Sequence, residues 1–260
     1  MNKQKYAFIT ILCLTSLILS ACITSGATAP KATETPAYTA TPAHTATPEP
    51  TATKTPLPSP TPRPSPTHNL EATKQYEDMA SKVKEYYQAG YVSTDQGTYK
   101  RLKPYWDSWA QIDWYQWVTV NSSPTNFIIR SEVSWESASK SPNPSGCGYV
   151  FRLRDENNHY MVFISTDGYI HASLVHSGYF DNMGKAYYGQ AATKGKETVT
   201  LIVEGTSFRV LVNDKSIKSF EGLQSDLFDG NLAYTIVSGT NKDFGTHCMF
   251  DKTDLWTIKK

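Results

Sequence analysis

The segment Gly146–Val175 constrains the fold of this chain more than any other. Its sequence, GCGYVFRLRDENNHYMVFISTDGYIHASLV, contains three runs with β-strand character, at Cys147–Arg154, Tyr160–Ser165 and Tyr169–Val175. Because successive side chains of a strand point to opposite faces, the first run should present one apolar face and one mixed face. The predicted apolar face consists of Cys147, Tyr149, Phe151 and Leu153.

Turn-forming residues separate these three runs. Asp155–Asn158 is rich in residues that tolerate a left-handed backbone, and Asp167-Gly168 is the strongest hairpin signal in the chain. A meander of three strands is not stable alone, so the rest of the C-terminal half should supply its partners. The further runs with strand character are Asn126–Trp135, Glu197–Glu204, Ser207–Asn213, Ser216–Phe220, Asn231–Ser238 and Thr246–Ile258.

These strands predict an all-β domain over 111–260, built as a sandwich of two antiparallel sheets. The segment 70–110 precedes this domain and contains a helix and an aromatic stretch. Leu70–Ala89 shows helical periodicity, and Gly90 is placed to end the helix. The helix should pack on the β domain; contact with another chain is the alternative. Its apolar stripe consists of Leu70, Tyr76, Met79, Val83, Tyr86 and Tyr87.

The N-terminus carries an export signal over 1–21. Lysines at positions 3 and 5 precede an apolar run, Tyr6–Leu19, that is too short for a comfortable membrane span. The run ends in Leu-Ser-Ala-Cys, which resembles the bacterial lipobox. This resemblance implies cleavage before Cys22, acylation of its thiol and anchoring to the outer face of a membrane. The alternative is an ordinary cleaved signal followed by an incidental cysteine.

The segment 22–69 is predicted to be a disordered linker. Between Ile23 and Thr67 lie 11 of the 15 prolines, mostly beside Thr and Ala, with few apolar side chains to bury. Such a composition cannot offset the entropy cost of folding and favours extended, partly polyproline II chain. We interpret it as a spacer, although dense Thr beside Pro also resembles O-glycosylated stalks.

The aromatic segment Tyr105–Trp117 holds four of the six tryptophans. On a strand, Trp114 and Gln116 would lie on one face and Tyr115 and Trp117 on the other. Flat rings beside Asn, Asp or Gln are typical of sugar-binding sites, whereas aromatic rings in general fill cores. Both interpretations stay open. The candidate ligand-binding aromatics are Trp106, Trp109, Trp114, Tyr115 and Trp117.

Three segments carry a resemblance to a known superfamily. They are GYVFRLRDENNHYMVFIS, VTLIVEGTSFRVLVNDKSI and the pair FDGNLAYTIVSGT and MFDKTDLWTI. In this order they resemble the concanavalin A-like lectin and glucanase jelly rolls, most closely the branch that contains the 3-keto-disaccharide hydrolase domain. Asp214 stands where that pattern usually has Gly. The resemblance implies a jelly-roll sandwich over about 125–260, an architecture that hosts lectins, glucanases and structural modules.

Two cysteines, Cys147 and Cys248, remain once the signal is removed and Cys22 is acylated. Exported proteins readily oxidise such a pair, and in a jelly roll the early and late strands lie side by side. We therefore predict a disulfide, with two buried thiols as the alternative. No CxxC or HxxxH pattern accompanies them, so no metal site is predicted.

The sequence gives no sign of catalysis. Members of this fold that cut β-glucans carry Glu-x-Asp-x-x-Glu, which this chain lacks. Glu132 and Glu136 would lie about 13 Å apart on a strand, too far for glycoside hydrolysis. Arg152 is a candidate ligand contact but would equally suit an ion pair with Glu132. Four loop and strand positions could contact calcium, although solvated side chains are the simpler interpretation: Asn241, Asp243, Asp251 and Asp254.

These observations predict a lipid-anchored, non-catalytic module at the cell surface that binds a polysaccharide or other glycan. With 25 basic and 24 acidic side chains, the balance of charge does not favour nucleic acid, and no cofactor is predicted. Two alternatives remain. One is a structural or protein-interaction module of the envelope with the helix as docking surface, and the other is a hydrolase of disaccharide derivatives.

Overall fold

The computed structural model describes residues 69–140 and 144–259. The predicted signal peptide, the acylation site at Cys22 and nearly all of the predicted linker lie outside these residues. Within the described ranges, no helix combines the length and the apolar character needed to cross a membrane.

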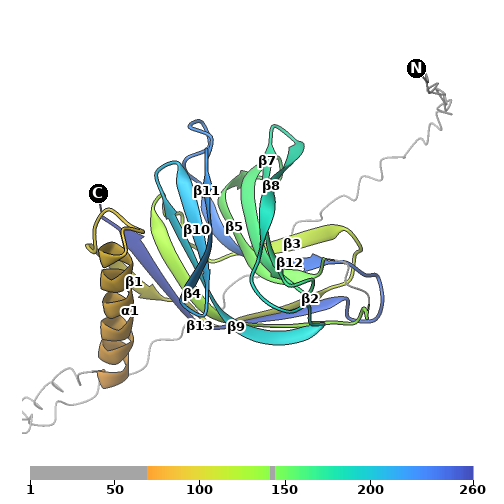
Figure 1. Cartoon of the computed structure of the whole chain (residues 1–260), viewed down its shortest axis with the longest axis horizontal. Helices are drawn as coiled ribbons and strands as arrows, with labels where there is room; N and C mark the ends of the chain where they lie inside the picture. The colour runs from red at the N-terminus through yellow and green to blue at the C-terminus, as the bar shows by residue number, and fades with distance from the viewer. Residues whose placement is uncertain (1–68, 141–143, 260) are drawn as a thin grey trace, which may run out of the picture. The chain divides into compact units, whose positions relative to one another are not determined.

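The described residues form one helix and 13 strands, which confirms the predicted all-β class preceded by a helix (Figure 1). Three of the strands, β1, β2 and β8, were not predicted from the sequence. The elements are α1 (Leu70–Gln88), β1 (Gly97–Arg101), β2 (Tyr105–Trp109), β3 (Trp114–Thr119), β4 (Phe127–Ser137), β5 (Gly146–Asp155), β6 (Asn158–Ser165), β7 (Tyr169–His176), β8 (Tyr179–Tyr187), β9 (Lys194–Glu204), β10 (Ser207–Val212), β11 (Lys215–Glu221), β12 (Asn231–Ser238) and β13 (Thr246–Ile258).

The strands form two antiparallel sheets. The seven-stranded sheet has the order β1-β13-β4-β9-β10-β11, with β2 also paired to β13. The six-stranded sheet has the order β3-β12-β5-β6-β7-β8, so the predicted meander forms its centre. Its register pairs Cys147 with Ile164 and Val162 with Ala172. The segment between the helix and β3 contributes β1 and β2 to the seven-stranded sheet.

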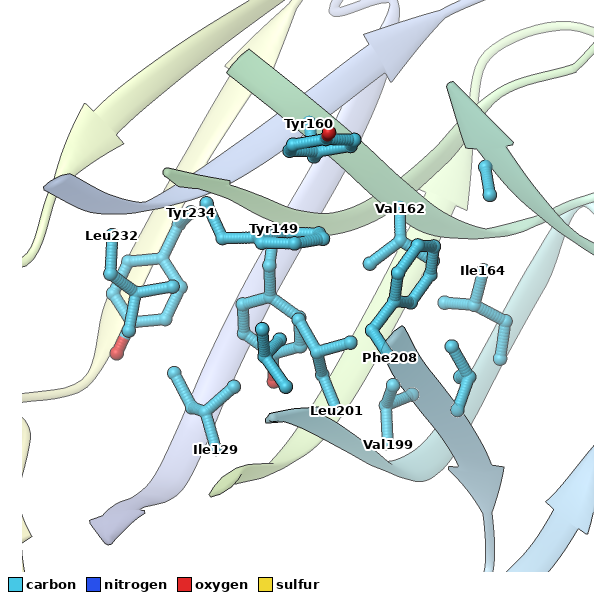
Figure 2. Close-up of a cluster of buried hydrophobic side chains, with 14 of the residues drawn as sticks. Ile129, Tyr149, Tyr160, Val162, Ile164, Val199, Leu201, Phe208, Leu232 and Tyr234 are labelled. Atoms are coloured by element: carbon cyan, nitrogen blue, oxygen red, sulfur yellow. The ribbon is translucent and has the colours of Figure 1, made fainter. Parts of the chain in front are cut away.

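The main core lies between the two sheets and is rich in aromatic rings (Figure 2). Tyr149 and Tyr160 enter it from the six-stranded sheet and meet Phe208 and aliphatic side chains of the seven-stranded sheet. The Tyr149 hydroxyl is fully buried, and it is satisfied because it donates to Ser131 Oγ at 2.8 Å. Alternate residues of each strand therefore close the sandwich, as period-two patterning requires.

Helix α1 packs on the outer face of the seven-stranded sheet, which confirms the packing interpretation. Met79, Val83 and Tyr86 are buried there against Ile128 and Trp256, among others. The Asn69 side chain caps the helix by accepting from the Ala72 N–H at 3.1 Å. Leu70 and Tyr87, at the two ends of the predicted stripe, are exposed. Tyr76 is also partly exposed, although its ring lies 6.0 Å from that of Trp256 between centroids.

A bulge in β5 corrects the predicted alternation of that strand. The register against β6 shifts between Phe151 and Asp155, and Arg152 adopts a left-handed φ of 49°. As a result Leu153 joins Val150 on the outer face of the sheet instead of following Phe151 into the main core. The adjoining Gly230 has no room for a side chain, because a Cβ there would lie 2.5 Å from the Arg152 carbonyl carbon.

The same bulge overturns the expectation that Arg152 contacts a ligand. Its side chain is only 1% exposed, and it donates to the carbonyl oxygens of Gly205 at 2.6 Å and Leu227 at 3.4 Å. Burial lowers the pKa of this guanidinium. Arg152 therefore connects the loops that contain Gly205 and Leu227, and it does not pair with Glu132.

A disulfide joins Cys147 of β5 to Cys248 of β13, with 5.7 Å between their Cα atoms. It therefore connects the six-stranded sheet to the seven-stranded sheet through the core. The two cysteines are 101 residues apart in the chain. A cross-link over so long a loop restricts the unfolded chain strongly.

Replacing both cysteines, as Cys147→Ala with Cys248→Ala, should lower the free energy of unfolding by about 2–5 kcal/mol. Most of this loss comes from the greater freedom of the unfolded chain. Urea unfolding followed by tryptophan fluorescence measures it. The wild-type protein with reductant is the matched control, because it keeps both sulfur atoms in the core. A loss under about 1 kcal/mol in both samples would contradict the prediction.

Candidate functional site

The outer face of the six-stranded sheet is apolar, although the main core lies on its other side. The central strands β5 and β6 are buried along almost their whole length on both faces. The outward-facing side chains form a second cluster, separate from the main core. An apolar face of this size needs a cover, because exposed apolar surface is unfavourable in water. The cluster consists of Val150, Leu153, Met161, Phe163, Ala233 and Val237.

Aromatic side chains of β3 provide that cover. This strand pairs with β12 at the edge of the sheet, and its alternation places Tyr115 and Trp117 against the apolar cluster. The two rings lie 5.7 Å apart between centroids. Trp114, on the other face of the strand, lies 6.1 Å from Tyr115. The sequence predicted this division of faces correctly, and the structure adds which face meets the sheet.

A histidine that the sequence analysis missed lies beneath these rings. His159, at the start of β6, lies 5.2 Å from Trp117 between ring centroids. Its Nδ1 is 3.2 Å from the Asp155 carbonyl oxygen, and its Nε2 is 2.8 Å from the Tyr115 hydroxyl. A carbonyl only accepts, so Nδ1 carries the proton; in the neutral ring Nε2 then accepts from Tyr115.

Burial decides the ionisation of this pair. It lowers the pKa of His159 from its ordinary value of 6.5, and the hydrogen bond to Asp155 opposes that effect only in part. Burial also raises the pKa of Tyr115. At neutral pH both groups are therefore uncharged, and the hydrogen-bond chain from Tyr115 through His159 to the backbone holds the β3 aromatics in place.

A cleft of about 590 Å³ opens between the β3 aromatics and the ends of two hairpins. Trp114 and Phe180, which are 56% and 60% exposed, present large ring surfaces to it. The β5–β6 turn contributes Glu156 and Asn157, so carboxylate and amide groups lie beside the rings. The lining residues are Trp109, Trp114, Tyr115, Gln116, Trp117, Glu156, Asn157, Val175, Gly178 and Phe180.

Hydrogen bonds hold the two hairpin ends together as one rim. The Gly178 N–H donates to the Asn157 carbonyl oxygen at 3.1 Å, and the Ser177 N–H donates to Asn158 Oδ1 at 3.0 Å. Ser177 and Gly178 both have positive φ, 52° and 79°, as a tight two-residue hairpin turn requires. The rim is therefore set by backbone geometry before any ligand arrives.

Of the five candidate aromatics, the structure brings four together in the cleft: Trp109, Trp114, Tyr115 and Trp117. Trp109 also packs against the main core, which supports the core interpretation for this residue, and its role in ligand binding stays a prediction. Trp106 lies apart, on the outer face of the seven-stranded sheet, where it is 69% exposed and its ring is 6.4 Å from that of His247.

Several acidic side chains considered for catalysis or calcium have partners of their own in the fold. Glu132 pairs with Lys196 and Lys252, whose hydrogen bonds lower the pKa of its carboxyl. Asp254 accepts from Arg101 at 2.6 Å and from Tyr99 at 2.7 Å. Within the described ranges, no group of three or more His, Cys, Asp and Glu side chains is arranged to hold a metal ion.

Neither a known family model nor a curated protein sequence matches the chain. Among solved structures it resembles the carbohydrate-binding module CBM66 from Bacillus subtilis, with a TM-score of 0.44 and 12% identity over 60% of this chain and 94% of that one. It also resembles sheep galectin-11 in complex with glycerol, with a TM-score of 0.36 and 12% identity over 56% and 98% of the two chains.

A third similar structure is the fructosyltransferase from A. japonicus, with a TM-score of 0.42 and 12% identity. The match covers 64% of this chain and only 27% of the fructosyltransferase. The assignment of a two-sheet sandwich rests on the strand pairing given above.

Acidification should destabilise the fold through His159. The pKa of His159 is lower in the folded protein than in the unfolded chain. Below about pH 6.5 the unfolded chain therefore binds more protons than the folded protein. The free energy of unfolding should consequently fall as the pH is lowered from 7.5 to 5. His159→Gln removes this titration but keeps an oxygen that can accept from Tyr115. Urea unfolding at both pH values should show a smaller fall for the variant than for the wild type. Equal falls in the two proteins would contradict the prediction.

Proposed function

We propose that the sandwich binds carbohydrate chains in the cleft beside β3. The observation that carries this proposal is the pair of exposed rings, Trp114 and Phe180, on opposite sides of a cleft that also holds amide and carboxylate groups. An aromatic face packs well against the C–H bonds of a sugar ring, while side-chain amides and carboxylates bind its hydroxyl groups. A cleft open to solvent suits a segment within a long chain.

The proposed activity is binding without catalysis. Glycoside hydrolysis normally uses two carboxyl groups on either side of the scissile bond. Among the described residues that line the cleft, Glu156 supplies the single carboxylate. This arrangement favours the binding module over a hydrolase of disaccharide derivatives. The docking alternative loses support as well, because the apolar face of α1 is already buried against the sheet.

We further propose that a lipid on Cys22 anchors the protein to the outer face of a membrane. The proposal is supported by the Leu-Ser-Ala-Cys sequence at the end of the apolar N-terminal run. At about 3.1 Å per residue, an extended linker of some 45 residues would reach at most roughly 140 Å. That reach would carry the sandwich clear of the membrane to meet surface polysaccharide.

Three sequence segments resemble concanavalin A-like jelly rolls, and they support a proposal about the superfamily to which the sandwich belongs. We place the sandwich in that superfamily, nearest the branch containing the 3-keto-disaccharide hydrolase domain. The architecture hosts binding and catalytic proteins alike, so this placement does not itself choose between them.

Truncating the exposed rings of the cleft should weaken glycan binding. We expect Trp114→Ala and Phe180→Ala each to lower affinity about tenfold for whichever polysaccharide the wild type binds on an array, because each removes a ring face from the ligand. The matched control is Trp106→Ala, which removes an exposed tryptophan that lies outside the cleft. The proposal fails if the wild type binds no polysaccharide, or if the control variant loses as much affinity as the cleft variants.

Replacing the acylated residue should release the protein from the membrane. Expressed in a bacterium that processes lipoproteins, the wild type should partition into the detergent phase of a Triton X-114 extract. Cys22→Ala should move to the aqueous phase, because it cannot carry the lipid chains that give stable anchoring. Aqueous partition of the wild type would refute the anchor while leaving the cleft proposal intact.

A further inference from the structure

The residues that line the cleft carry a single formal charge, and it is negative. Of the ten residues that line the cleft, Glu156 alone carries a formal charge at neutral pH. Its side chain is exposed, and it has no ion pair or hydrogen bond with any other described residue. A carboxylate in a ligand cleft without a protein partner is free to meet a charged group of the ligand.

The cations around the rim do not neutralise this carboxylate. Arg154 is engaged with Asp229 at 2.7 Å. Lys185, on the same outer sheet face, lies over the Tyr169 ring at 4.3 Å, toward the opposite end of β7 and β8. Asp155, directly before Glu156, adds a second carboxylate to the turn, where it accepts from the Asn157 N–H at 2.8 Å.

The rings strengthen the same preference. The face of an aromatic ring is electron-rich and attracts a cation within about 6 Å of its centroid, with Trp the most effective. The cleft sets tryptophan and phenylalanine side chains beside an unpaired carboxylate. The rings and the carboxylate together attract a positive group and repel a negative one. A neutral hydroxyl group could donate a hydrogen bond to the carboxylate but would gain no attraction between opposite charges.

Building on the proposed glycan binding, we propose that the cleft selects polysaccharides with free amino groups over neutral polysaccharides. A protonated amine on a sugar ring would approach Glu156 while the C–H face of the same ring packs on Trp114 or Phe180. Polymers of uronic acids would be excluded, because their carboxylates would face Glu156 without a nearby free cation.

Two oligosaccharides test this preference directly. The hexamers of β-1,4-linked glucosamine and of β-1,4-linked glucose share one backbone and differ in the group on carbon 2, an amine or a hydroxyl. Calorimetric titration of the full-length protein with each hexamer, at about pH 6, measures the two affinities. We expect the glucosamine hexamer to bind about three- to tenfold more tightly.

The variant Glu156→Gln should bring the ratio of the two affinities close to one. Its matched control is Glu77→Gln on the exposed side of α1, which changes the net charge equally but lies outside the cleft and should keep the wild-type ratio. Raising the salt from 0.05 to 0.5 M should also reduce the ratio for the wild type, because ions screen the attraction.

Equal affinities for the two hexamers in the wild type would overturn this inference, as would a ratio that Glu156→Gln leaves unchanged. Failure to bind either hexamer would overturn it too. In that case the polysaccharide array decides the proposed function separately. Binding of another polysaccharide there, lost in Trp114→Ala, would show that the cleft binds glycans but does not select for amines.

Discussion

The organisation of this protein depends on one sheet that is apolar on both faces. Tyr149 and Tyr160 point from the meander into the main core, whereas Val150 and Met161 point the opposite way. The seven-stranded sheet covers only the first of these faces. The second face must be shielded from water by something else, and the aromatic side chains of β3 do so. The cleft therefore exists because the shield is a single edge strand and covers the face incompletely.

A neutral hydrogen-bond chain fixes the shield in position. The Tyr115 hydroxyl donates to His159, and His159 donates to the Asp155 carbonyl oxygen. The Tyr115 hydroxyl and both ring nitrogens of His159 therefore have partners, which matters because a buried polar group without one costs about 1–3 kcal/mol. Asp155 also begins the turn that carries Glu156. This series of hydrogen bonds thus connects the aromatic wall of the cleft to the turn that carries Glu156. Both parts should move little when a ligand binds.

The bulge at Arg152 shapes the other side of the same region. Bulges bend a strand and redirect side chains, and they are common next to functional sites. Here the bulge turns Leu153 outward to extend the apolar floor and sends the Arg152 guanidinium inward to the carbonyl oxygens of two loops. The end of β5 is thereby held firmly where it enters the turn. A charged side chain that the sequence suggested for ligand binding acts within the fold.

The sequence alone determined the features that depend on local periodicity. The alternation of β3 separated Tyr115 and Trp117 from Trp114, and the helical spacing identified Met79 and Val83, because both patterns come from backbone geometry. Half-exposed edge strands such as β8, with glycine and charged residues, lack a clear alternation, so Phe180 was not recognised. Only the tertiary structure decided that Glu156 and Phe180 face the β3 aromatics, that Arg152 is buried and that Trp106 lies elsewhere. These relations join residues far apart in the chain, and they follow from how the sheet curves and pairs, which no local pattern encodes.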